Sequence, residues 1–345
     1  MTGMAGVTRP GGAPEQRPGR LGVGVVGAGR VGAVLGSALR AAGHVVVAVS
    51  AVSAESRARA DVLLPGIPVV DVPEVVRRAE LVLLAVPDDE LAGLVQGLAD
   101  IGAWQPGQIV VHTSGRFGVG VLTPARAAGA IPLALHPAMT FTGTSLDLSR
   151  LVGCAFAVTA PGPVLPIGQA LVVEIGGEPV VVAEADRPLY HAALAHGANH
   201  LVVLVAQATQ ALAAAGVDDP SRVLAPLLGA ALDSALRAGS TGAGAITALT
   251  GPVRRGDDGT VRDHLGVLAG LGASTGSLDV EASYRVLARA ATQRALAGGL
   301  IGQAAAERLV DALARPDLPR VDDASAGDAD RDLGTDPGRA QEDDA

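Results

Sequence analysis

Two histidines in this sequence stand where a strand-like run gives way to a short polar segment. His112 precedes Ser114 and Gly115, and His136 precedes Pro137. Histidine is the usual proton donor or acceptor near neutral pH, and the chain has no lysine that could take that role. We therefore predict acid–base catalysis by His136 first and His112 second. Ser114 and Gly115 are the expected substrate contacts beside them. A histidine at a strand end can instead bond to a backbone carbonyl, and this alternative stays open.

A glycine-rich hexapeptide near the N-terminus matches the pattern G-x-G-x-x-G. It follows the strand-like run 21–26 and opens a helical pattern over 31–42, which is the context that gives the pattern meaning. The first glycine permits a tight turn, the second lets the backbone approach a pyrophosphate, and the third allows close helix packing. Helix N-terminal amides would then face the phosphates. The predicted cofactor contacts are Gly27, Ala28, Gly29, Arg30, Val31 and Gly32.

The type of dinucleotide is indicated at the end of the second expected strand, 45–49. An NAD-binding protein usually has an acid there that binds the ribose 2′-hydroxyl. This sequence has Ser50 and Ser53 instead, with Arg57 shortly after and no acid before Glu55. Hydroxyls and an arginine suit a 2′-phosphate. We predict NADP(H), although Ser53 could equally cap the next helix and Arg57 could be solvated. Val86 and Pro87, which end the fourth expected strand, should form part of the cofactor's wall.

Two polar segments in the second half are further candidates. His196 shares a helix face with Asn199 and also with His200, and we predict that Asn199 positions the substrate. The two histidines lack the acid of H-E-x-x-H, so we predict no metal site. A Gly-Pro turn is followed by Arg254 and Arg255, one of which could bind a substrate anion. An interface role for the first segment and a plain surface loop for the second stay open.

The elements that must position these residues change in kind along the chain. Strands and helices alternate over 21–185, which predicts an α/β domain with a doubly wound parallel Rossmann sheet. Helical patterns alone follow over 186–315, and they predict an all-α domain. Residues 1–20 and 316–345 are predicted to be disordered. The expected strands are 21–26, 45–49, 67–70, 81–86, 108–112, 131–136, 154–159 and 179–182.

Composition excludes several classes of protein. The chain has 345 residues, which suits two domains, and a formal net charge of −9, which argues against a general nucleic-acid binder. The single cysteine, Cys154, excludes an internal disulfide and a cysteine-based zinc site. No signal peptide is evident, and the apolar run 201–215 falls short of the ~20 residues of a membrane span. We expect that run to be a buried helix, and the protein to be cytoplasmic, with a small-molecule substrate and no membrane or nucleic-acid partner.

The motifs together resemble bacterial proteins with a Rossmann-like domain followed by the helical domain of unknown function 2520. Those proteins are similar to pyrroline-5-carboxylate reductase, ketopantoate reductase and the 6-phosphogluconate dehydrogenase group. The resemblance covers roughly residues 20–315, and it implies a homodimer formed through the helical domain. Ala195 stands where the 6-phosphogluconate group has a lysine, so that mechanism cannot be copied. The motifs are 27–32, 85–88, 112–115, 136–137, 198–201 and 250–257.

We therefore predict an NADP-dependent oxidoreductase that transfers a hydride between NADP(H) and a small, anionic carbonyl or imine compound. A catalytically silent NADP-binding sensor or scaffold is the alternative from another class. A reduced deazaflavin as hydride partner is a second alternative within the enzyme class.

Overall fold

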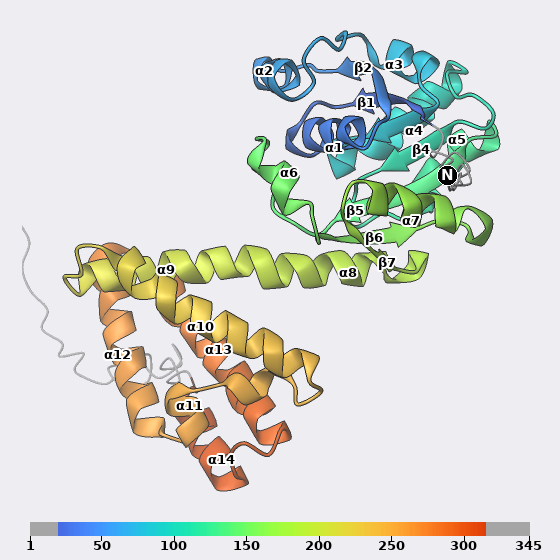
Figure 1. Ribbon diagram of the computed structural model, residues 1–345. Helices are drawn as coiled ribbons and strands as arrows, with labels where there is room; N and C mark the ends of the chain where they lie inside the picture. Colours follow the sequence, from blue (N-terminus) through green and yellow to red (C-terminus); the bar gives the residue numbers. More distant parts are fainter. Residues whose placement is uncertain (1–19, 315–345) are drawn as a thin grey trace, which may run out of the picture. The chain divides into compact units, whose positions relative to one another are not determined.

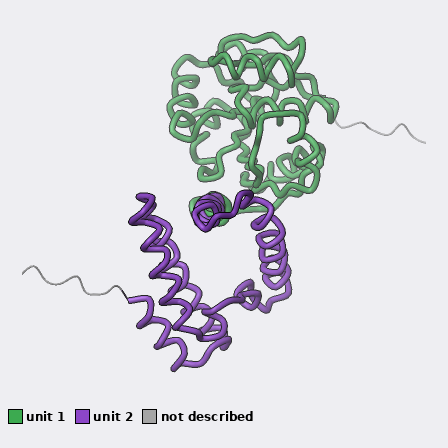
Figure 2. The backbone as a smooth tube through the Cα atoms, turned by 90° about the vertical axis from the view of Figure 1, so that its left-hand side faces the viewer, with its two compact units in different colours: residues 1–201 green, residues 202–345 purple. Residues whose placement is uncertain are grey.

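The computed structural model of the protein describes residues 20–314 (Figure 1). The disorder predicted for 1–20 and 316–345 falls, apart from Arg20, outside these residues. The chain divides into two compact units after Leu201, drawn in green and purple in Figure 2. The sequence places the boundary after residue 185 instead. The difference arises because helix α8 (Arg187–Leu194) is anchored to the sheet by its first residue, as described below.

The first unit is built on a seven-stranded sheet with the strand order β2-β1-β3-β4-β5-β6-β7. All neighbouring strands are parallel except β5 and β6, which pair antiparallel. This confirms the α/β class with a largely parallel sheet. The strand predicted over 67–70 is wrong: Val69 makes a single bridge to Val49, and the neighbouring Pro68 has no N–H for a ladder. The strands are β1 (Gly22–Val26), β2 (Val45–Ser50), β3 (Leu81–Leu84), β4 (Ile109–His112), β5 (Ile131–Pro137), β6 (Ala155–Thr159) and β7 (Glu178–Val181).

Helices cover both faces of this sheet because successive strand residues point to opposite sides. In β3, Leu81 and Leu83 belong to one apolar core, and Val82 and Leu84 belong to another. The parallel strands from β1 to β5 end at the same edge, where the loops that follow them must meet. The helices of the unit up to the sheet's last strand are α1 (Arg30–Ala41), α2 (Ala54–Leu63), α3 (Val72–Arg78), α4 (Asp88–Asp100), α5 (Thr123–Ala127), α6 (Leu146–Arg150) and α7 (Leu165–Glu174).

The second unit is helical, as the sequence predicts. A small core of Val261, Leu265 and Leu309, each nearly or fully buried, holds its last helices together. Its helices, the first of which begins at the end of the first unit, are α9 (His200–Ala214), α10 (Pro220–Ser240), α11 (Gly251–Arg255), α12 (Asp258–Thr275), α13 (Leu278–Ala297) and α14 (Gln303–Ala312).

The expectation that 201–215 forms a buried helix is wrong for the single chain. Gln207 is the buried residue of α9, and its amide donates to a carboxylate oxygen of Asp279 and to the hydroxyl of Ser283. Apolar side chains on other sides of α9 are exposed, and Val202 is 69% exposed. Packing inside the unit therefore covers one narrow side of this apolar helix.

One helical stretch among the described residues, Glu184–Ala214, is long and apolar enough to cross a membrane by length and composition alone. A single stretch of this kind is weak evidence for a membrane span, because helices of soluble proteins can have the same length and composition.

Candidate active site

The glycine loop has the geometry of a dinucleotide-binding turn. Gly27 adopts a φ of 92°, and a Cβ there would lie 2.6 Å from the carbonyl oxygen of Ala85. A Cβ on Gly32 would lie 2.1 Å from the carbonyl oxygen of Gly27. By contrast, a Cβ on Gly29 would meet no atom of the described chain within 4 Å. Gly27 and Gly32 are therefore required by packing, whereas Gly29, the N-cap of α1, leaves open space in front of the helix amides.

The residues predicted to hold a 2′-phosphate have more than one role. The hydroxyl of Ser50 is buried and accepts from the N–H of Gly27 at 3.0 Å, so it shapes the glycine turn. The hydroxyl of Ser53 caps α2 by accepting from the N–H of Ser56 at 3.1 Å. Arg57 is exposed, and its Nε donates to the carbonyl of Ala51 at 3.3 Å. Arg57 thus folds over the β2–α2 turn. A second arginine of α2, Arg59, lies nearer the glycine loop, because its Nη1 donates to the carbonyl of Ala28 at 3.2 Å.

Val86 and Pro87 lie beside the same loop. Pro87 is the N-cap of α4, and Val86 Cγ1 would be 3.4 Å from a Cβ on Gly27. Val86 is half-buried, and Pro87 is exposed. Val86 thus lies next to Gly27, and the cofactor wall formed by Val86 and Pro87 stays a prediction.

A cavity of about 250 Å³ lies in the first unit where β5 ends. His136 and Asn199, both predicted from the sequence, line it together, and His191 lines it as well. Asn199 closes a π-helical turn, Ala195–Asn199, a distortion that often marks functional sites. The lining residues are His136, Ala138, Met139, Thr140, His191, Leu194, Ala195, Ala198 and Asn199.

His136 is held on one side by a tyrosine that the sequence did not single out. Its Nδ1 lies 2.9 Å from the hydroxyl of Tyr190, and the two rings meet edge to face at 5.6 Å between centroids. The ring of His191 lies 6.3 Å away in the same manner. Burial, then the positive charge of Arg187 and the neighbouring His191 lower the pKa of His136 to about 4. At neutral pH the imidazole is therefore uncharged.

Arg187 lies beneath this cluster and is completely buried. Its guanidinium Nη1 donates to the carbonyl of Ser114 at 3.1 Å, and its Nη2 donates to the carbonyls of Ala134 at 2.9 Å and Ala157 at 3.0 Å. Its Nε donates to the hydroxyl of Thr159 at 2.8 Å. These bonds tie the start of α8 to β5, to β6 and to the loop after β4. Among residues 20–314, no carboxylate lies within 4 Å of its nitrogens to balance the charge.

His112 does not take the catalytic role predicted for it. It is completely buried, its Nε2 lies 2.8 Å from the carbonyl oxygen of Gly118, and its Nδ1 accepts from the N–H of Ser114 at 3.2 Å. Both ring nitrogens are thus used by the backbone, which is the alternative that the sequence left open. The hydroxyl of Ser114 is buried and accepts from the N–H of Phe117 at 3.2 Å, so it too serves the loop.

Gly115 is the part of that loop that reaches the cavity residues. A Cβ on Gly115 would lie 2.8 Å from Cδ2 of His191 and 2.9 Å from Nε2 of His136. The absence of a side chain here lets both imidazoles approach the backbone after β4.

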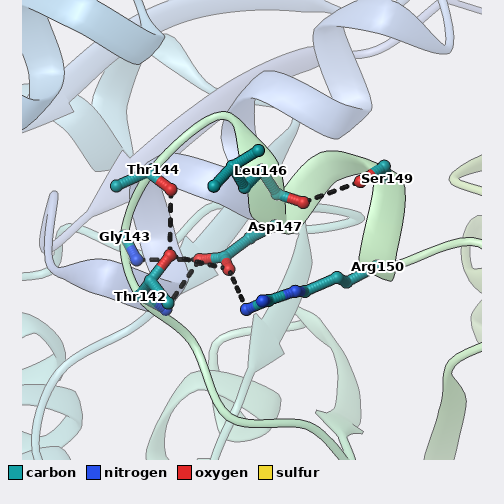
Figure 3. A network of polar contacts seen from close by, with 7 residues as sticks. All are labelled: Thr142, Gly143, Thr144, Leu146, Asp147, Ser149 and Arg150. Atoms are coloured by element: carbon teal, nitrogen blue, oxygen red, sulfur yellow. Dashed lines mark hydrogen bonds and ion pairs between the residues drawn. The ribbon is translucent and has the colours of Figure 1, made fainter.

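The loop after β5 joins the cavity to the glycine loop. The carboxylate of Asp147 is buried and accepts from the N–H groups of Thr142 at 2.8 Å and Gly143 at 2.7 Å, and from the Thr142 hydroxyl at 2.9 Å (Figure 3). A Cβ on Gly143 would lie 3.3 Å from Cα of Arg30 and 2.7 Å from Nε of Arg59. The buried carboxylate therefore fixes a loop that touches the start of α1, a contact the sequence gave no sign of.

The arginines predicted to bind a substrate anion lie in the second unit. Arg254 is committed to the structure of that unit, because its Nη1 donates to the carbonyl of Leu300 at 2.6 Å. Arg255 is exposed at the end of α11. The structure thus contradicts anion binding by Arg254, and anion binding by Arg255 stays a prediction.

The pair His196 and His200 forms no metal cluster within the described chain. Their Nδ1 atoms lie 2.9 Å apart on an exposed helix surface. No group of three or more metal-ligating side chains occurs between residues 20 and 314.

Comparison with known families agrees with this architecture. The family model of a Rossmann-like domain matches residues 7–137, and that of the domain of unknown function DUF2520 matches residues 154–291. The chain is a Rossmann-like protein with a DUF2520 domain. The resemblance inferred from the motifs is thereby confirmed. None of the curated proteins matches the sequence.

Several solved structures share the fold of this Rossmann-like DUF2520 protein. The Bacteroides fragilis protein BF3122, a candidate NADP oxidoreductase, is 22% identical with a TM-score of 0.63, over 79% of this chain and 98% of its own. Protein TM1727 from Thermotoga maritima is 20% identical with a TM-score of 0.55, over 79% and 98%. A reductive aminase from Aspergillus terreus, in complex with NADPH and ethyl levulinate, is 18% identical with a TM-score of 0.58, over 85% and 99%. At these identities the likeness is one of fold.

Proposed function

We propose that this protein is an NADP(H)-dependent oxidoreductase that acts on a small, anionic carbonyl or imine compound in the cavity beside His136. The open space in front of Gly29 carries the cofactor assignment, since the chain leaves unfilled the place that a pyrophosphate takes in Rossmann domains. The NADPH complex of the fungal reductive aminase and the name of BF3122 support it. NADP(H), when bound, would supply or accept the hydride.

The chain's own contribution is to place a substrate and a proton. His136 lines the cavity and is uncharged at neutral pH, so it can act as a base or as a neutral N–H donor. Asn199 and Thr140 add polar groups to the lining. The buried charge of Arg187 gives the site a positive potential, which favours an anionic substrate.

The choice of NADP(H) over NAD(H) rests on the β2–α2 turn. β2 ends in Ser50 with no acid before Glu55, and Arg57 covers the turn. An arginine at this place is the usual partner of a 2′-phosphate.

We further propose that the protein is a soluble, cytoplasmic homodimer that pairs through its helical unit. The apolar side chains of α10 are widely exposed in the single chain, with Leu227 62% and Leu236 65% exposed. Exposed apolar surfaces of this kind are covered in interfaces between proteins.

A spectrophotometric screen tests the activity. NADPH oxidation is followed with small oxo acids and with their imines formed from amines, using the full chain and His136→Ala. Turnover by the wild type, with intact NADPH binding but at least a hundredfold lower turnover in His136→Ala, would support the proposal. Tight NADPH binding without hydride transfer to any compound would favour the silent sensor or scaffold instead.

A further inference from the structure

We propose that Tyr190 delivers the proton to the substrate through His136, and that buried Arg187 holds the phenolate left behind. This inference rests on the proposed function, and it assigns roles to two residues that the sequence did not indicate.

The hydrogen bond between Tyr190 and His136 has one favourable direction. The hydroxyl of Tyr190 makes no other hydrogen bond to the described residues. Tyr190 is half-buried. Its phenol is a stronger acid than the N–H of a neutral imidazole, so we assign the phenol as the donor and Nδ1 of His136 as the acceptor. The neutral ring then carries its proton on Nε2. That atom lies on the side of the ring that faces Gly115, away from the tyrosine.

The buried positive charge of Arg187 can stabilise a phenolate at Tyr190. Its guanidinium is completely buried, and its four hydrogen bonds go to neutral oxygens. Arg187 and Tyr190 are three residues apart on α8, so both lie on one face of the helix. Burial raises the pKa of Tyr190, while the charge of Arg187 opposes this rise. A buried cation with neutral neighbours stabilises an anion formed close to it.

Apart from the thiol of Cys154, which raises the pKa of Tyr190, the remaining charged and titratable groups around His136 and Tyr190 do not oppose such an anion. His191 lies on α8, the helix that carries Tyr190. His112 lies on β4, and both of its ring nitrogens bond to the backbone. The carboxylate of Glu184, near Arg187, accepts from the N–H groups of Val119 at 2.7 Å and Gly120 at 2.9 Å. The phenolate would therefore face Arg187 as its main charged neighbour.

The proton transfers balance in the direction of reduction. The hydride adds to the carbon of the carbonyl or imine, and its oxygen or nitrogen takes the proton from Nε2 of His136. Nδ1 takes the phenol proton of Tyr190 at the same time, so the imidazole stays neutral throughout. The phenolate remains beside Arg187 until Nδ1 of His136 returns the proton to it and water supplies a new proton to Nε2, which restores the starting tautomer. The reverse sequence serves oxidation.

Nitrogen NMR of the histidines tests the direction of the relay without any substrate. In the wild-type chain, His136 should be neutral at pH 7 with its proton on Nε2. Tyr190→Phe should shift His136 toward a mixture of both tautomers, because Nδ1 loses its donor. The matched control is Tyr284→Phe, because Tyr284 lies 2.8 Å from Nδ1 of His264 in the second unit; it should alter His264 and leave His136 unchanged. A proton on Nδ1 of His136 in the wild type would overturn the relay.

A second measurement tests the role of Arg187. The chain has two tyrosines, so the Tyr284→Phe background leaves Tyr190 as the sole phenol. Ultraviolet titration should show that Arg187→Gln raises the pKa of Tyr190 by about one unit or more, which is a tenfold change, whereas Arg187→Lys raises it less. An unchanged pKa in Arg187→Gln would remove Arg187 from the relay. NADPH titration of the wild type separates the two proposals, since a wild type that does not bind NADPH would contradict the proposed function without changing the tautomer measured for His136.

Discussion

Gly115 and His136 lie so close together that a Cβ on Gly115 would come within 2.9 Å of the imidazole Nε2. Gly115 follows β4 and His136 lies near the end of β5, and these two strands are neighbours in the sheet. The missing side chain thus allows the imidazole to rest against the loop of the next strand, at the cavity's edge.

Gly115→Ala should displace His136 and His191 without disturbing the glycine loop. We expect turnover to fall at least tenfold, with NADPH affinity unchanged, measured by NADPH oxidation and by calorimetric titration. Gly93→Ala is the matched control: Gly93 lies in α4, a Cβ there would meet nothing within 4 Å, and the variant should gain about 0.5–1 kcal/mol of stability. Full turnover in Gly115→Ala would contradict a role of His136 in the reaction.

Gly29→Ala should weaken NADPH binding without weakening the fold. The backbone of Gly29 has a φ of −68°, which alanine adopts freely, and the added Cβ meets no protein atom within 4 Å. It would, however, enter the space proposed for the pyrophosphate. We expect an unchanged Tm and an NADPH affinity lowered at least tenfold, about 1.4 kcal/mol. Unaltered affinity would mean that the dinucleotide lies elsewhere.

Asp147→Asn should loosen the loop that touches α1. Burial opposes ionisation of Asp147, but the N–H donors of Gly143 and Thr142 outweigh it and hold its pKa below the ordinary value. The stabilisation is therefore full above about pH 3.9 and is lost as the pH falls through the lower folded pKa. We expect urea unfolding at pH 7 to show a loss on the order of 2 kcal/mol, with a smaller difference from wild type below that pH. A difference that does not shrink in acid would contradict the role of the carboxylate.

The predictions from sequence succeeded where the signal is local. The glycine loop, the buried strands and the change to helices after residue 185 follow from spacing and periodicity within one segment. His136 was singled out because it ends a strand-like run, and Asn199 because of its helical spacing from His196; both line the cavity.

The parts of the site that the sequence did not predict depend on contacts between distant segments. Tyr190 meets His136 across 54 residues, and Arg187 meets the Ser114 carbonyl across 73. Patterns of residue spacing within one segment cannot predict contacts between residues so far apart in the chain. Likewise, His112 has the same strand-end pattern as His136, and only the structure shows that backbone groups use both of its nitrogens.

Acidification should destabilise the protein well before its carboxylates protonate. Burial is the main cause that lowers the pKa values of His112 and His136 to about 4, from about 6.5 in the unfolded chain. Between these values the unfolded state binds more protons, so stability falls as the pH falls. Urea unfolding from pH 7 to pH 5 should show this slope, and His112→Asn should reduce it by up to one proton. An equal slope in His112→Asn would show that His112 titrates normally in the fold.

The most direct test of the central claim is calorimetric titration of the full chain with NADPH and then with NADH. The Rossmann loop and Arg57 predict that NADPH binds at least tenfold more tightly, about 1.4 kcal/mol, and that Arg57→Gln removes most of this preference. Arg126→Gln, an exposed position on α5, should leave both affinities unchanged. Equal affinities for NADPH and NADH would contradict the assignment of NADP(H), and no binding of either would contradict the proposed function itself.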